Sequence, residues 1–111
     1  MTATIELDWP SPALSPNARD HWSVKAKAAA SAKLAAWTLA KEAKAEPGRS
    51  IEIEFCPPTA HRRDLDNMLA SLKPALDGIS AAIGVDDSEW SLTIRKGKPV
   101  KGGAVFVTVN P

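Results

Sequence analysis

The sequence contains very little cysteine, since Cys56 is the only one among its 111 residues. A single thiol excludes an intrachain disulfide, and it also excludes a structural zinc site built from several cysteines. Because persistent disulfides belong to oxidising compartments, this composition fits a reducing one. We therefore expect a cytoplasmic protein.

Long hydrophobic runs are also missing. No run of about 18 apolar residues occurs in the chain, which excludes a membrane-spanning helix of the usual kind. The opening segment MTATIELDWP lacks the basic and apolar regions of a signal peptide. The length suits one globular domain with a modest core. We expect a single domain over residues 1–111, with no membrane partner and no small-molecule cofactor.

The chain has almost no net charge, but its charges are unevenly distributed. The formal net charge is +1. Residues 19–44 and 95–101 are mainly basic, whereas residues 64–89 carry six acids and the single base Lys73. An acidic centre between basic segments is able to hold a cation within and an anionic polymer around it. Chance segregation on a solvated surface is the alternative.

Hydrophobic periodicity predicts an α+β fold. Alternation predicts strands over residues 3–9, 50–56, 90–96 and 104–109. Helical residues and spacing predict helices over residues 18–45 and 65–83, and the proline-rich segment after the first strand predicts a turn or extended loop. The order is β-α-β-α-β-β, and we expect two layers, a mixed sheet covered by two main helices. The segment GKPVKGG between the last two strands resembles a hairpin loop.

Each predicted helix has a candidate core face. In the first helix this face is marked by Val24, Ala28, Ala35 and Leu39. The second helix has a stronger stripe, formed by Leu65, Leu69, Leu72, Leu76, Ile79 and Ile83. Pro74 lies inside the second helix and is expected to kink it, because it removes the hydrogen bond to the Ala70 carbonyl.

Aspartates gather at both ends of the second helix. Asp64 and Asp66 lie at its start in the segment RRDLDN, and Asp86 and Asp87 follow its end. On a helical wheel, Asp66, Lys73 and Asp77 fall at about 80° to 120° from the centre of the leucine stripe, which places them on one line. A structural explanation stays open, because Asp64 is a good N-cap, Asn67 completes a weak capping box, and VDDSE suits a plain turn.

Taken together, these residue types favour metal-dependent phosphodiester hydrolysis. Mg²⁺ and Mn²⁺ prefer carboxylate and water oxygens, and metal ions polarise a phosphate and generate the attacking hydroxide. A neighbouring lysine supplies positive charge where charge develops on phosphorus. Close carboxylates repel one another without metal, so Asp64→Asn or Asp87→Asn is expected to raise the melting temperature of the metal-free protein.

The segments RRDLDN, LKPALDGI and GVDDSEW, with DWPSPALSPNARDHW near the start, resemble the RusA family of Holliday-junction resolvases of phages and prophages. The resemblance spans most of the chain. It implies that Asp64, Asp66 and Asp87 are catalytic and bind Mg²⁺, with Mn²⁺ as a substitute, and that Lys73 is the catalytic lysine. Some members place this lysine four residues after the second aspartate, where this chain has Ala70.

The resemblance further implies a homodimer that cuts four-way DNA junctions symmetrically, in a bacterial or phage-infected cell. Two paired incisions in a nearly twofold junction call for two equivalent active sites. Residues expected to orient the site are Asn67, Asp77 and Asp86, and those expected to contact DNA are Asn17, Arg19, Lys25, Lys27, Arg62, Arg63, Lys96 and Lys98. Alternatives are a non-catalytic branched-DNA-binding module of the same fold, or a nuclease that prefers flaps or other branched substrates.

Overall fold

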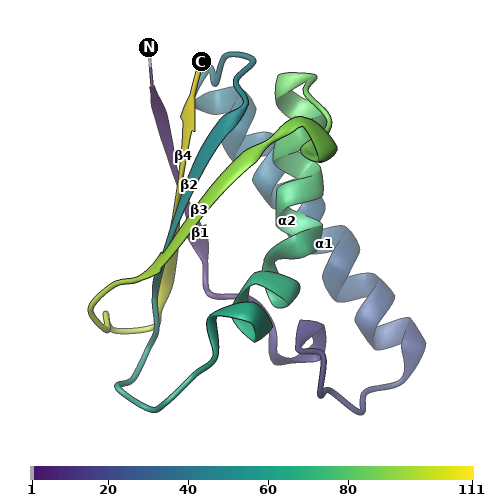
Figure 1. The fold of residues 1–111 in the computed structure, drawn as a ribbon. Helices are drawn as coiled ribbons and strands as arrows, with labels where there is room; N and C mark the ends of the chain where they lie inside the picture. Colours follow the sequence, from purple (N-terminus) through teal and green to yellow (C-terminus); the bar gives the residue numbers. More distant parts are fainter. Residues whose placement is uncertain (1) are drawn as a thin grey trace.

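The computed structural model describes residues 2–111 and confirms the α+β fold with the order β-α-β-α-β-β (Figure 1). Strands β1 (Ala3–Asp8), β2 (Ser50–Cys56), β3 (Ser91–Lys96) and β4 (Ala104–Asn110) form one mixed sheet in the order β1-β4-β2-β3. Helices α1 (Trp22–Glu42) and α2 (Leu65–Ile83) pack together and lie on the same side of the sheet in Figure 1. No helix within residues 2–111 has the length and apolarity needed to cross a membrane.

The core lies between the sheet and the two helices. Ile51, Ile53 and Phe55 of β2 are fully buried, while the alternating glutamates are only half-buried. The predicted orientation of β2 is therefore confirmed: its apolar face lies on the core, and its glutamate face is directed toward solvent. From the predicted stripe of α2, the structure buries Leu72, Leu76, Ile79 and Ile83, and it packs Leu65 and Leu69 against the edge of the core.

The predicted core face of α1 is only partly correct. Leu39 packs against the core and Ala28 is half-buried, but Val24 is 47% exposed and Ala35 is exposed, and the fully buried residues of α1 are Ala36 and Ala40. The reason is close packing against α2, because a Cβ at Gly78 would come within 2.2 Å of the Lys33 carbonyl oxygen. Only small residues allow two helix backbones to approach so closely, so alanines rather than the larger side chains face α2.

The expected hairpin between the last two strands is also wrong. β2 lies between β3 and β4, pairs in parallel with β3 and pairs antiparallel with β4. The loop over residues 97–103 therefore crosses over the end of β2, and β4 pairs with β1 on its other side. A parallel pair such as β2 and β3 needs a long crossover connection, and α2 supplies it.

The irregular segments decide where the candidate site lies. The proline-rich segment forms one 3₁₀ turn, η1 (Pro12–Leu14), and a second turn, η2 (Asp87–Glu89), follows α2. α2 continues through Pro74 as one helix from Leu65 to Ile83. The start of each helix, the proline-rich segment and residues 57–64 lie at one end of the molecule, and the chain termini lie at the other end (Figure 1).

Candidate active site

Asp64 occupies the N-cap position of α2 without acting as a cap. Its backbone is extended, with φ −89° and ψ 132°, and its side chain makes no capping hydrogen bond. The capping box with Asn67, which was one structural explanation for Asp64, is therefore not formed. Asp64 and Asp66 are both exposed, and no basic side chain within residues 2–111 forms an ion pair with either of them. Their carboxylates are available to a ligand.

The loop that leads into α2 is held in place by Arg63. The Arg63 guanidinium donates hydrogen bonds to the carbonyl oxygens of Thr59 (2.9 Å) and His61 (3.2 Å). It also lies over the indole of Trp9, 5.8 Å from the ring centroid. The ammonium of Lys96 donates to the Arg63 carbonyl oxygen at 3.1 Å. These bonds fix the backbone immediately before Asp64, so the loop sets the place from which its side chain projects.

A cavity of about 560 Å³ opens beside Asp64, and we call it the Trp9 cavity. Trp9, Pro10 and Met68 form apolar parts of its wall, and the polar part includes Asp64, Arg62, Arg63 and Asn67. Trp9 was not among the predicted site residues. The one available signal was its position directly before the proline-rich segment, which the structure folds back toward the start of α2.

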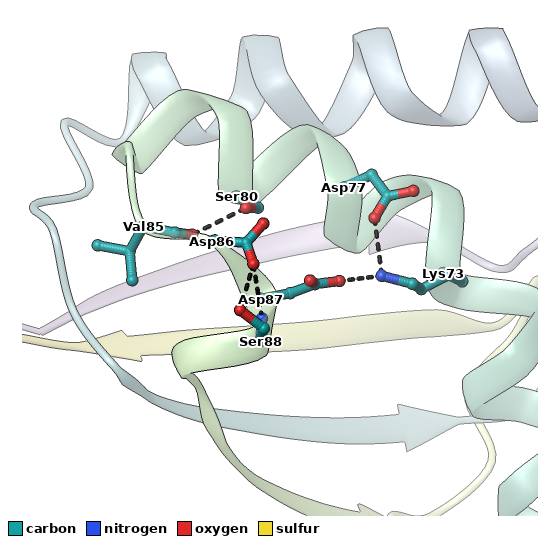
Figure 2. A network of polar contacts seen from close by, with 7 residues as sticks. All are labelled: Lys73, Asp77, Ser80, Val85, Asp86, Asp87 and Ser88. Atoms are coloured by element: carbon teal, nitrogen blue, oxygen red, sulfur yellow. Dashed lines mark hydrogen bonds and ion pairs between the residues drawn. The ribbon is translucent and has the colours of Figure 1, made fainter.

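Lys73, Asp77 and Asp87 form the second part of the site, farther along α2 (Figure 2). The Lys73 ammonium donates to Asp77 Oδ1 at 2.9 Å and also pairs with Asp87 Oδ2. Asp77 is one helical turn beyond Lys73, and η2 brings Asp87 back onto the same face of α2. The line of polar residues predicted by the helical wheel is thus confirmed for Lys73 and Asp77, and Asp87 joins it.

Asp86 has a different role from its neighbour Asp87. It is the N-cap of η2, and its carboxylate accepts hydrogen bonds from the backbone N–H of Ser88 at 3.2 Å and from the Ser88 hydroxyl. These bonds lower the pKa of Asp86 below its usual range, because they favour the ionised form. The Ser80 hydroxyl donates to the Val85 carbonyl oxygen at 2.8 Å and thereby ties the turn to α2 (Figure 2). Together these contacts hold Asp87 against Lys73.

The two parts of the site do not form a closed metal centre. Residues 2–111 contain no group of three or more His, Cys, Asp or Glu side chains placed to hold a metal ion. Asp87, paired with Lys73, therefore does not meet Asp64 and Asp66 as a third ligand. The carboxylates of Asp64 and Asp66 do fit the usual kind of Mg²⁺ site. In such a site one or two carboxylates bind the ion, and waters and substrate phosphates complete its coordination shell.

The expected DNA-contacting residues divide into two groups. Three of them donate to backbone carbonyl groups and so support loops: Lys25 bonds to Ala18 at 2.8 Å, and Arg63 and Lys96 make the contacts described above. The others have exposed side chains and remain candidates for phosphate contacts: Asn17, Arg19, Lys27, Arg62 and Lys98. Cys56, at the end of β2, is buried, and burial raises the pKa of its thiol, so it is not an activated nucleophile.

Comparison with known proteins finds a relative that aligns with almost the whole of this chain. The chain is 38% identical over 116 aligned residues to an uncharacterized protein of Xylella fastidiosa (strain Temecula1 / ATCC 700964). The alignment covers 96% of this chain and 75% of the relative. No protein-family model matches the chain. At this identity and coverage, the chain belongs to the same protein family as the Xylella fastidiosa protein.

Proposed function

We propose that the protein is a metal-dependent, structure-specific endodeoxyribonuclease that resolves Holliday junctions by symmetric phosphodiester hydrolysis. The observation that carries this proposal is the carboxylate of Asp64, which makes no capping bond and lines a cavity. Asp64 stands at a helix start, and Arg62 and Arg63 line the same cavity. A carboxylate held by a braced loop beside two guanidinium groups suits a site that binds a cation and a phosphate together.

The surroundings of Asp64 favour a polyanionic substrate. The starts of α1 and α2 lie at the same end of the molecule, and helix starts carry partial positive charge from their free N–H groups (Figure 1). Arg19, Lys27 and Arg62 are exposed in the segments at this end. Contacts of this kind position a phosphate backbone without reading its sequence. That fits recognition of branched DNA by shape.

In this proposal, Asp64 and Asp66 would hold Mg²⁺ or Mn²⁺, which would lower the pKa of a bound water and offset negative charge on the phosphate. Lys73 contributes positive charge near the phosphate that reacts. Asp77 and Asp87 hold the Lys73 ammonium in one place, with Asp77 at 2.9 Å from it. Asp86 supports this arrangement through its hydrogen bonds to Ser88.

Symmetric incision calls for a homodimer, since each junction offers two equivalent sites. The outward face of α1 offers a surface for it, because Leu34 is 64% exposed and Trp37 is 40% exposed one turn farther along the same face. Large apolar side chains grouped on a surface often mark a protein contact. We place the proposed dimer in the cytoplasm of a bacterial or phage-infected cell.

The test is incision of a labelled four-way junction beside a linear duplex of the same sequence, with Mg²⁺ and with Mn²⁺. The wild type should cut the junction symmetrically, and Asp64→Asn should abolish cutting. Glu42→Gln is the matched control, because it makes the same carboxylate-to-amide change at the exposed far end of α1. Full incision by Asp64→Asn would refute the proposal.

One observation favours a second candidate, a non-catalytic branched-DNA-binding module. Asp87 is paired with Lys73 and does not meet the other two carboxylates. A module of this kind would bind junctions with an affinity that a chelator leaves unchanged, and it would not cut them with any metal. The same incision assay, accompanied by a binding titration in chelator, separates the two candidates.

A further inference from the structure

The Trp9 cavity has the size and lining of a small-ligand site. Its volume of about 560 Å³ lies within the range of roughly 300–1,000 Å³ that is typical of ligand pockets. One part of its wall is apolar and aromatic, and the other part carries hydrogen-bonding and cationic groups. A planar ligand with polar edges and an attached anion matches both parts. A nucleotide is such a ligand.

The aromatic part of the wall is rigid. Trp9 packs edge-to-face against Phe55, with ring centroids 6.2 Å apart and an angle of 81° between the planes. Phe55 is fully buried in the sheet, so this contact anchors the indole to the core. The Arg63 guanidinium lies over Trp9 and is itself fixed by its bonds to Thr59 and His61. Unpaired bases stack on aromatic rings and on arginine guanidinium planes, and the cavity wall offers both.

The polar part of the wall has a side chain able to read a base edge. Asn67 is half-buried and lines the cavity, and its side-chain amide has no hydrogen-bond partner within residues 2–111. Its backbone carbonyl accepts from the Ser71 hydroxyl at 3.0 Å, so the residue is held on the helix. An amide offers both a donor and an acceptor, which is the pattern that pairs with base edges.

The cavity adjoins the candidate metal ligands. Asp64 and Arg62 line the same cavity as Trp9 and Asn67. In a DNA strand the base and its phosphate are joined through one sugar, so a base inside the cavity brings its phosphate close to Asp64 and Arg62. We propose that the Trp9 cavity takes one unstacked nucleobase of the substrate strand, and that this places a phosphodiester at Asp64.

This inference rests on the proposed nuclease function and gives it a source of specificity. Extracting a base from continuous duplex costs free energy, and the cost is least where pairing and stacking are already interrupted. Strands at a branch point are interrupted in this way, whereas a linear duplex is not. A cavity that must be filled by a base would therefore favour branched DNA without reading a long sequence.

The experiment measures base binding apart from incision. Replacing Trp22, Trp37 and Trp90 by Phe leaves Trp9 as the only tryptophan. Trp22 and Trp37 are exposed, and the Trp90 indole N–H is buried with no hydrogen-bond partner within residues 2–111, so these changes should preserve the fold. With Mg²⁺ present, a tetranucleotide, which contains no junction to cut, should quench Trp9 fluorescence. A tetranucleotide-length abasic backbone should bind about tenfold more weakly and leave the fluorescence unchanged.

A filling variant provides the matched comparison. Ser71→Met adds volume at the cavity wall, and Ala81→Met adds the same side chain on the exposed surface near the end of α2. Ser71→Met should lose the fluorescence change, and Ala81→Met should keep it. Equal binding of the abasic backbone, or an unchanged response in Ser71→Met, would overturn the proposal.

A second measurement uses the unmodified protein, so the result does not depend on the folding of any variant. Abasic sites are placed one at a time near the crossover of a four-way junction. At one position, incision should fall about tenfold. Unchanged incision at every position would refute the base site and leave the nuclease intact. Base-dependent quenching without any incision would keep the base site and refute the nuclease.

Discussion

Replacing Asp87 by Asn tests whether the second part of the site is built for function or for stability. Asp87 pairs with Lys73, and the side chains are 30% and 54% exposed. Ion pairs this exposed are worth about 0.2–1 kcal/mol. Lys73 keeps Asp77 as a partner at 2.9 Å, so it is not left unpaired. We expect Asp87→Asn to lower the free energy of unfolding by about 0.5 kcal/mol, which corresponds to a decrease of about 2 °C in melting temperature.

This result differs from what the sequence alone predicts. Close carboxylates would repel, and Asp87→Asn would then stabilise the metal-free protein. In the structure a lysine has already neutralised that repulsion, so the sign reverses. For Asp64→Asn no ion pair and no capping bond is lost. Its unfolding free energy should therefore stay within about 0.5 kcal/mol of the wild type, because weaker attraction to the helix dipole opposes relief of repulsion.

Thermal unfolding in chelator, followed by circular dichroism, measures both changes, and the junction assay measures incision. Glu89→Gln is the control, because it breaks the exposed pair with Arg49 (3.3 Å) on the same turn, η2, and should leave incision unchanged. A loss above about 2 kcal/mol in Asp87→Asn would exceed any exposed ion pair. It would show that Asp87 supports the fold, and lost incision in that variant would carry no information on catalysis. A rise in melting temperature would refute the ion pair itself.

Two further predictions concern α2 and the turn η2 that follows it. Incision by Lys73→Ala should fall about a hundredfold or more, because the positive charge is lost. The double change Ala70→Lys and Lys73→Ala places a lysine four residues after Asp66, on the same helix face, and should restore incision to at least about a tenth of the wild-type rate. Ser88→Ala should raise the pKa of Asp86 toward its usual value of 3.8 in a carboxyl NMR titration. Because Ser88 lowers this pKa in the folded state, its stabilising effect should be present near neutral pH and vanish as the pH falls through the lowered pKa of Asp86.

The individual strands and α2 could be predicted because their signals are local. β2 has the bounds that its alternation predicts, Ser50–Cys56, and the stripe of α2 faces the core. The core face of α1 could be predicted only in part. Its alanines carry little information on direction, and the contact is decided by Gly78 on another helix. Likewise, the loop over residues 97–103 has the composition of a hairpin, but pairing with the distant β2 decides its path.

The site shows the same division between local and non-local information. The wheel placed Lys73 and Asp77 together because they are four residues apart on one helix. The contact between Lys73 and Asp87 depends on how η2 folds back, and the bracing of Asp64 depends on Arg63, Trp9 and Lys96 from three separate segments. The free carboxylate of Asp64 could not be read from the sequence, because aspartate at a helix start usually caps.

The separation of the two parts of the site has an electrostatic consequence. Asp66 and Lys73 are seven residues apart, or about 10 Å along the axis of α2. Five aspartates and one lysine lie along α2 and in the turns at its ends, so the charge of this face is negative. The face therefore repels DNA when no divalent ion is bound. A nuclease that lays its strand along this face must therefore lose junction affinity in chelator. A non-catalytic module that binds only through the end carrying Arg19, Lys27 and Arg62 does not depend on a divalent ion in this way. The effect of chelator on junction affinity therefore distinguishes the nuclease from the module even before any incision is measured.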